Sequence, residues 1–106
     1  MLDLDEKILV TPLFPFDSQL NFEVFILELL PGCEHLSPPH DQGVIEHVIV
    51  VDGTVEILVD GAWRWLRKGK GLRFNAHQRH GYRNLGSDMA CIHDIIHYPY
   101  RKITEI

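Results

Sequence analysis

Apolar residues in this chain come in short runs, and none of these runs keeps the spacing of a helix. The runs are rich in Val, Ile and Phe, and Gly, Asp-Gly or Pro stands between them, which is typical of strands joined by turns. The pattern therefore predicts an all-β domain. The strands that we expect are 7–11, 21–30, 44–51, 54–59, 62–66, 72–74, 81–83 and 89–98.

Asp-Gly pairs punctuate the middle of the chain at Asp52-Gly53 and Asp60-Gly61. Such pairs between β-rich runs favour tight hairpins. We therefore expect the three runs between residues 44 and 66 to form an antiparallel meander. Pro38-Pro39, just before the meander, blocks a strand or a helix at that point.

Two of the expected strands, 22–30 and 44–51, are apolar at successive positions, whereas a sheet with one wet face would alternate. Both faces of these strands should therefore be covered. The domain's own core covers one face, and a second subunit is the simplest cover for the other, so the sequence predicts a homodimer. A monomer that uses its own N-terminal strand as the cover is the alternative.

Length and charge narrow the class of protein. The chain has 106 residues, 45% of them hydrophobic and 24% charged, which suits a single domain over 1–106. Its net charge of −5 lacks the basic surface that binds nucleic acid, so we expect no direct binding to DNA or RNA. No apolar run is long enough to cross a membrane. The acidic start, from Met1 to Glu6, is unlike a signal peptide and predicts a cytoplasmic protein.

Cysteine and histidine give contrasting signals. Cys33 and Cys91 match no zinc or redox spacing, and we interpret both as small buried side chains. Histidine is abundant, with seven residues in all. Six of them fall in the last two-thirds of the chain, namely His40, His47, His77, His80, His93 and His97.

His40, Glu46 and His80 are the candidate metal ligands, because two imidazoles and a carboxylate form a known set for divalent metals. Glu46 lies between valines in an expected strand, where an unpaired carboxylate would be costly. A metal is one partner for it; an Arg, a His or a bound ammonium group would also serve. His47, the next residue, points to the opposite face, where a dimer contact or a structural role is expected.

Two motifs connect these residues to a family. The first, about 32–53, reads Pro31-Gly32, then His40-x-Gln42-x-x-x-Glu46, then Gly53; the second, about 66–84, contains Phe74-x-Ala76-x-x-x-His80-x-Tyr82-x-Asn84. Together they resemble the two cupin motifs, and the resemblance implies a double-stranded β-helix or jelly-roll barrel. Gln42 stands where many metal-binding cupins have a second His, and Ala76 replaces a frequent Pro, so the resemblance implies weaker metal binding here.

A narrower resemblance covers residues 11–99. It is to the C-terminal sensor cupin of XRE-type helix-turn-helix regulators linked to sulfur utilisation, in which the cupin binds an effector and a separate helical domain binds DNA. No such helical domain is present in this chain, which leaves a free-standing relative and a separated piece as alternatives; the initial Met1 favours the first. The phrases that carry the resemblance are Leu13-Phe14-Pro15, Pro39-His40, Gly43 to Val48, Asp60 to Trp63, Arg73-Phe74 and Ile96 to Pro99.

The resemblance implies a homodimeric cupin that binds a small polar effector, an amino acid or a sulfur metabolite. A divalent transition metal (Zn, Fe, Mn or Ni) held by His40, Glu46 and His80 is the implied cofactor. A metal-dependent oxygenase, isomerase or decarboxylase is the alternative, and a purely structural dimerisation module is a third reading. We expect Gln42, Tyr82 and His93 to line the ligand pocket, His93 because it shares a strand face with His97.

Overall fold

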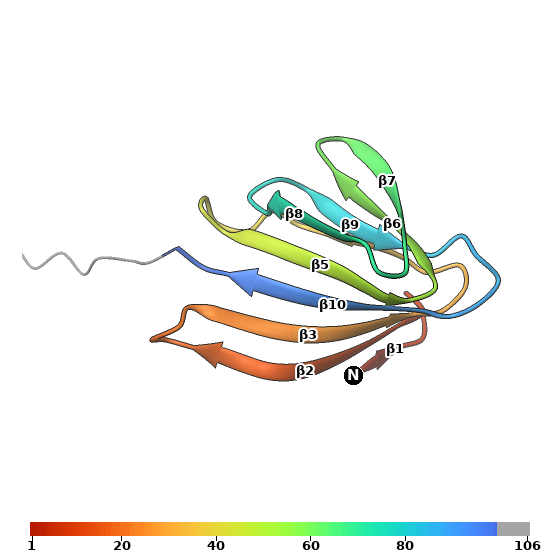
Figure 1. Ribbon diagram of the computed structural model, residues 1–106, viewed down its shortest axis with the longest axis horizontal. Helices are drawn as coiled ribbons and strands as arrows, with labels where there is room; N and C mark the ends of the chain where they lie inside the picture. The colour runs from red at the N-terminus through yellow and green to blue at the C-terminus, as the bar shows by residue number, and fades with distance from the viewer. Residues whose placement is uncertain (100–106) are drawn as a thin grey trace, which may run out of the picture.

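The computed structural model describes residues 1–99, and its ten regular elements are all β-strands (Figure 1). The strands are β1 (Leu2–Asp3), β2 (Ile8–Asp17), β3 (Phe22–Leu29), β4 (Glu34–Ser37), β5 (Ile45–Asp52), β6 (Thr54–Val59), β7 (Ala62–Arg67), β8 (Gly71–Asn75), β9 (His80–Arg83) and β10 (Ala90–His97). The predicted all-β class is confirmed. None of the described segments forms a helix long and apolar enough to cross a membrane.

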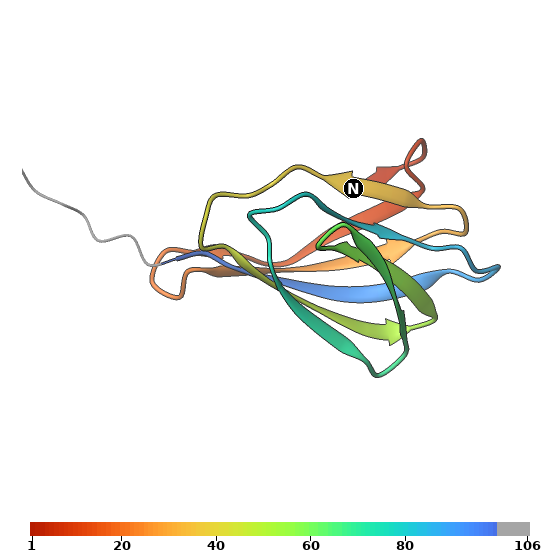
Figure 2. The same ribbon diagram turned by 90° about the horizontal axis from the view of Figure 1, so that it is seen from above.

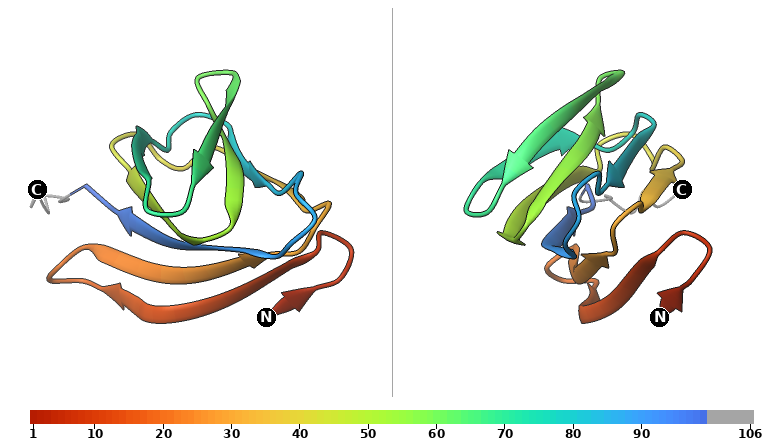
Figure 3. Two further views of the ribbon diagram at one scale, coloured as in Figure 1. Left: turned by 45° about the vertical axis from the view of Figure 1, so that its right-hand side comes forward. Right: turned by 90° about the vertical axis from the view of Figure 1, so that its right-hand side faces the viewer.

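The strands form two sheets that face each other, as the side views in Figure 3 show. The larger sheet has the order β1-β2-β3-β10-β5-β8, and the smaller one has the order β4-β9-β6-β7. Every pairing is antiparallel. The last strand, β10, lies in the middle of the larger sheet, between β3 and β5.

Alternation along the strands places the core between the two sheets. In β6, for example, Val55, Ile57 and Val59 are buried and the residues between them are not. In β10 the buried set is Ala90, Ile92, Asp94 and Ile96, so one carboxyl group points into an otherwise apolar layer. The other members of this core are Ile8, Leu27, Leu29, Cys33, Val44, Val48, Val50, Phe74, Ala76 and Tyr82.

The predicted meander is wrong at its first turn. Thr54–Val59 and Ala62–Arg67 do form a hairpin, but β5 pairs with β10 and β8 in the other sheet. Gly53 is the point where the chain crosses from one sheet to the other, with φ at +73°. A Cβ there would lie 3.0 Å from the Cα of Ala90. An Asp-Gly pair thus serves here as a corner, which local sequence cannot distinguish from a hairpin turn.

The N-terminal half has more strand than expected. β2 runs on to Asp17 through Pro12 and Pro15, where it is an edge strand and its register to β3 shifts, and edges tolerate the missing N–H of proline. The strands β1 and β4 were not expected at all. The hairpin between β2 and β3 ends beside the end of β10 (Figures 1 and 2), where Tyr98 N donates to Asn21 O at 2.8 Å.

The second face of the larger sheet has no layer over it within residues 1–99. We call this surface the outer sheet face. Its residues are half-buried or exposed, apart from Val24, and Cys91 is among them, so only Cys33 fits the prediction of two buried cysteines. By register the outer sheet face comprises Leu9, Thr11, Phe22, Val24, Ile26, Glu28, Ile45, His47, Ile49, Asp52, Gly71, Arg73, Asn75, Cys91, His93, Ile95 and His97.

Candidate metal centre and ligand cavity

The structure brings His40, Glu46 and His80 together at one end of the space between the sheets. Glu46 is the second residue of β5 and His80 opens β9, and both are fully buried. His40 comes from the loop after β4, and its backbone N–H donates to Ala76 O at 2.8 Å. The Ala76 N–H in turn donates to Val44 O at 2.8 Å, so the two loops that flank the site are tied to each other.

Each of the three side chains offers one ligand atom, and these atoms all lie within 4.8 Å of one another. The Nδ1 of His80 is 2.9 Å from the Gln78 carbonyl, which accepts its proton and leaves Nε2 facing the site. That Nε2 is 3.2 Å from Oε2 of Glu46, which has no hydrogen-bond partner in the described chain. Either a second proton on His80 or a cation between the two atoms completes this contact.

The protonation of the site follows from burial and contacts. Burial raises the pKa of Glu46, but its contacts with His80, Asp94 and Tyr82 outweigh burial and hold the pKa below its usual value. Burial lowers the pKa of His80, but the contacts with Glu46 and with the Gln78 carbonyl outweigh it and raise the pKa. Glu46 is therefore the carboxylate that stays ionised, which suits a cation.

The side chains of Asp94 and Tyr82 lie next to Glu46, and the Tyr82 hydroxyl contacts both carboxyl groups. The Tyr82 hydroxyl donates to Oε1 of Glu46 and lies 3.3 Å from Oδ2 of Asp94. Burial, and then the charge of Glu46, raise the pKa of Asp94 well above its usual value. Asp94 was not among the residues expected in the site, although its alternation with Ala90, Ile92 and Ile96 places it on the inner face of β10.

A cavity of about 150 Å³ opens beside this cluster. Its lining combines the polar side chains of His40, His80, Tyr82 and Asp94 with apolar side chains, and Asp94 lies directly beside Phe25 in the larger sheet. His35 closes one side, where its ring stacks on Tyr82 with centroids 6.1 Å apart and its Nδ1 contacts Glu6. The full lining consists of Ile8, Val10, Phe25, Leu27, His35, Ser37, His40, His80, Tyr82, Asp94 and Ile96.

Two residues that were expected in the pocket are elsewhere. His93 is on the outer sheet face, because β10 turns Asp94 inward and its neighbours outward. Gln42 is exposed in the turn before β5 and does not line the cavity. Tyr82 does line it. The pocket thus takes an aspartate where the sequence predicted a histidine.

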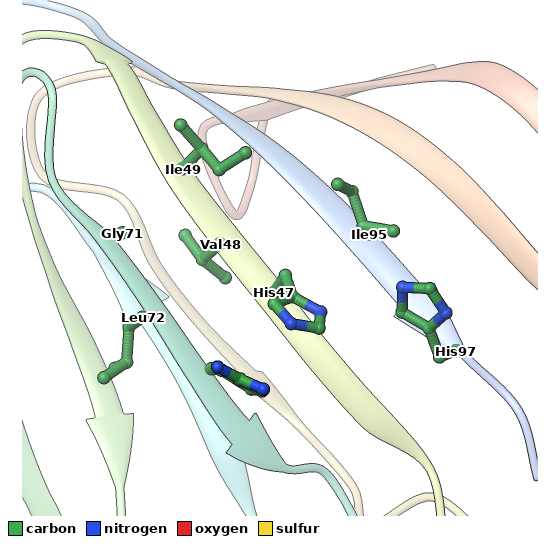
Figure 4. Close-up of a pocket in the computed structure, with 8 residues that line it drawn as sticks. His47, Val48, Ile49, Gly71, Leu72, Ile95 and His97 are labelled. Carbon is green, nitrogen blue, oxygen red and sulfur yellow. The ribbon is translucent and has the colours of Figure 1, made fainter.

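A second hollow lies on the outer sheet face, over β5, β8 and β10. Figure 4 shows the rings of His47 and His97 side by side on the neighbouring strands β5 and β10. The two ring centroids are 5.2 Å apart, and the groove has a volume of about 460 Å³. Burial, then the charges of His97 and Arg73, lower the pKa of His47. His47 does face away from Glu46, as expected.

The sequence family described as the cupin domain matches residues 25–96, which include both motifs and the three candidate ligands. The chain belongs to the cupin family. The two antiparallel sheets are thus the cupin fold, and His80 and Glu46 are buried between them.

Several relatives of this cupin are regulators of transcription. The HTH-type transcriptional regulator SutR of Escherichia coli (strain K12) is 46% identical over 94 residues, which are 89% of this chain and 53% of that protein. The chain thus spans about half the length of the curated relative it matches.

Two crystal structures agree with this. One is the cupin domain of an XRE family transcriptional regulator from Enterobacter cloacae, 45% identical, with a TM-score of 0.87 over 89% of this chain and 99% of that one. The other is an HTH_3 family transcriptional regulator from Vibrio cholerae, 32% identical, with a TM-score of 0.86 over 92% of this chain and 55% of that one. This cupin is therefore homologous to the cupin domains of helix-turn-helix regulators.

Proposed function

We propose that this cupin is a sensor domain that binds a small polar effector, such as an amino acid or a sulfur metabolite, in the cavity beside His80. The 46% identity to the regulator SutR carries the proposal. The lining of the cavity supports it, because a few polar groups among apolar side chains are what a small-ligand site needs. Regulators of this type act in the cytoplasm, which is where we place the protein. The net charge of −5 argues against direct nucleic-acid binding by this chain.

The same proposal includes a divalent transition metal (Zn, Fe, Mn or Ni) held by His40, Glu46 and His80. The donor set fits such an ion, because two imidazoles and one carboxylate meet within 4.8 Å. The bond from Nδ1 of His80 to a backbone carbonyl is the kind of support that orients a metal-binding imidazole. When bound, the ion supplies a Lewis acid that can hold an oxygen or sulfur atom of the effector.

A metal-dependent enzyme is the second candidate, because two His and one carboxylate leave open positions on an ion. A general acid or base is needed beside such a site. Tyr82 is the neighbouring hydroxyl, but its proton is engaged by Glu46, and burial raises its pKa well above the usual value. His93, the other candidate acid or base, is on the outer sheet face. The sensor is therefore preferred.

We also propose that the protein is a homodimer through the outer sheet face. The outer sheet face spans five strands that lie about 4.8 Å apart, and each strand has about eight residues with a rise of about 3.3 Å per residue. The projected area of this face is therefore roughly 600 Å². That size approaches the roughly 800 Å² per partner of a stable interface. The acids Glu28 and Asp52 lie at one end of this face, and Arg73 and His47 lie toward the other. A two-fold axis across the strands sets the acidic end of one copy against the basic end of the next.

The test of the dimer is sedimentation velocity with two variants. Ile49 is 40% exposed in the outer sheet face, and Ile49→Asp should convert dimers into monomers. Leu85, 68% exposed in a loop away from that face, provides the control Leu85→Asp, which should remain dimeric. A monomeric parent protein, or a dimer that withstands Ile49→Asp, rules out this interface.

Elemental analysis of protein purified without a metal-affinity tag tests the metal, and native mass spectrometry of the same sample shows any retained small molecule. We expect about one transition metal per chain, lost in Glu46→Gln and retained in Asp5→Asn, where the carboxylate is exposed in the turn before β2. Turnover of a candidate substrate by the metal-loaded protein would favour the enzyme over the sensor. Metal that persists in Glu46→Gln would show that the ion is bound elsewhere.

A further inference from the structure

Positive charge is concentrated in one stretch of this acidic chain. Residues 1–60 contain twelve Asp and Glu and a single Lys, whereas residues 61–87 contain seven Lys and Arg and no Asp or Glu. Two of these seven are used elsewhere, because Arg83 pairs with Glu34 and Glu56, and Arg73 lies on the outer sheet face. Four others are exposed on β7 or in the turn that follows it, and we call them the basic edge: Arg64, Arg67, Lys68 and Lys70.

The basic edge follows an open side of the smaller sheet. β7 is the last strand in the order β4-β9-β6-β7, so it pairs with β6 and with no second strand. Figures 1 and 3 show β7 at the rim of the sandwich, on the far side from β1. Every second N–H and C=O of such a strand points away from its neighbour. Within residues 1–99, Ala62 to Leu66 make no backbone–backbone hydrogen bond outside the pairing with β6, so these groups are free to accept an added strand.

The charges of the basic edge have little compensation inside the chain. Arg64 lies 3.9 Å from Asp60, but both side chains are more than half exposed, so this pair contributes little. Arg67, Lys68 and Lys70 form no ion pair in the part of the chain that the structure describes. A partner with several carboxylates therefore gains charge contacts here and displaces almost none that the chain already makes.

Trp65 favours a protein as that partner. Its side chain is 62% exposed on the same strand as Arg64 and Arg67. Trp and Arg are the residue types that most often dominate the binding energy of protein interfaces. A long polyanion such as DNA would also meet Glu56, the register partner of Trp65, and Asp60 just before β7. The positive surface is thus about one strand long, which fits a short acidic segment of a protein.

We propose that β7 binds an acidic, extended segment of a partner protein, which joins the four-stranded sheet as a fifth strand. The backbone of the segment bonds to the free edge of β7, which is a recurring mode of peptide recognition. Its carboxylates contact the basic edge, and an apolar side chain at an alternate position contacts the ring of Trp65. This surface includes no residue of the ligand cavity or of the outer sheet face, so its test does not depend on the sensor function or on the dimer.

Four fluorescently labelled probes separate charge, strand geometry and nucleic acid. The first is a capped peptide of alternating Glu and Val, about as long as β7. The second has Gln at every Glu, the third has Pro in place of the central Val residues, and the fourth is a single-stranded DNA of similar length. Fluorescence anisotropy at low ionic strength gives the dissociation constants. We expect the Glu–Val peptide to bind at least about tenfold more tightly than the other three, because only it combines peptide carboxylates with a complete set of backbone donors.

Two further measurements locate the binding on β7. Amide hydrogen exchange of Ala62–Arg67 should slow when the Glu–Val peptide binds, as it does when a strand edge is covered. Lys68→Gln combined with Lys70→Gln should weaken this peptide about fivefold, since two exposed charge pairs are lost. The control combines Ser18→Glu with Gln19→Glu in the exposed loop between β2 and β3, which changes the net charge by the same amount and should leave the affinity nearly unchanged.

Several results would overturn the proposal. Equal binding of the Gln peptide would remove the role of charge, and equal binding of the Pro peptide would remove strand addition. Tighter binding of the DNA would make the basic edge a nucleic-acid surface. Failure of all four probes to bind would mean that the charges of β7 only protect an open edge from aggregation. The ranking of the probes on the parent protein needs no variant, and the variants change only exposed side chains.

Discussion

Asn84 joins the two sheets at the end of β9, and its replacement should be among the most destabilising changes in the chain. The side chain is 1% exposed and makes three hydrogen bonds. Its Nδ2 donates to Leu29 O at 2.9 Å and to Asp88 O at 2.8 Å, and its Oδ1 accepts from Gly86 N at 2.9 Å. One amide thus bonds to the end of β3 and to both sides of the following loop.

The expected cost of Asn84→Ala is about 3 kcal/mol, from three bonds at about 1 kcal/mol each. For a chain of this length that loss corresponds to a fall of about 12 to 24 °C in the melting temperature. Asn84→Asp keeps the acceptor but sets a carboxylate against two carbonyl oxygens. It should be at least as damaging at neutral pH and should recover partly as the carboxyl is protonated in acid.

Urea unfolding followed by circular dichroism measures these losses, with Gln19→Ala as the control because the amide side chain of Gln19 is exposed in the loop between β2 and β3. The control should be nearly neutral. A loss below about 1 kcal/mol for Asn84→Ala, with an unchanged dependence on urea, would mean that water replaces the three bonds, and the reasoning would fail.

Two further predictions address the corner and the buried acids. Gly53→Ala should lower the free energy of unfolding in urea by several kcal/mol, because φ is +73° and the new Cβ would lie 3.0 Å from Ala90 Cα. The control Gly69→Ala places its Cβ in open space and should cost only the strain of its own positive φ. Equal losses of stability in the two variants would contradict this. Both His80 and Asp94 have raised pKa values in the folded protein, so their contribution is complete below the unfolded values and is lost as the pH rises through the folded ones. Above the pH range where Glu46 protonates, metal-free protein should therefore lose stability as the pH rises, and Asp94→Asn should lose less. Parallel curves for the two proteins would refute this assignment.

Much of the fold could be predicted from local sequence, because it depends on period-two alternation and on turn residues. The hairpin at Asp60-Gly61 and the long last strand are examples. The site motifs were equally local: His40, Glu46 and His80 are recognisable by type and spacing, and the structure brings them together.

Local sequence could not predict which of the two sheets a strand joins, or which of its faces points into the core. Asp52-Gly53 has the same composition as the hairpin turn that follows, and only the pairing of β5 with β10 makes it a corner. His93 was predicted in the pocket because it shares a strand face with His97. The opposite face of β10, which carries Asp94 together with Ala90, Ile92 and Ile96, is the one that points into the core. β4 is short and half-exposed, and it exists because β9 lies beside it.

The central place of β10 has a consequence for how the protein is made. Of the ten strands in residues 1–99, this one leaves the ribosome last, and it holds β3 and β5 together through pairings on both of its edges. Until Ala90–His97 emerges, the β2–β3 hairpin and β5 have no strand between them, and their unpaired edges are available to other chains. Nascent chains stalled before Ala90 should thus be aggregation-prone and sensitive to protease. The ligand cavity should form only after β10 is synthesised, because Asp94 and Ile96 of this strand line it.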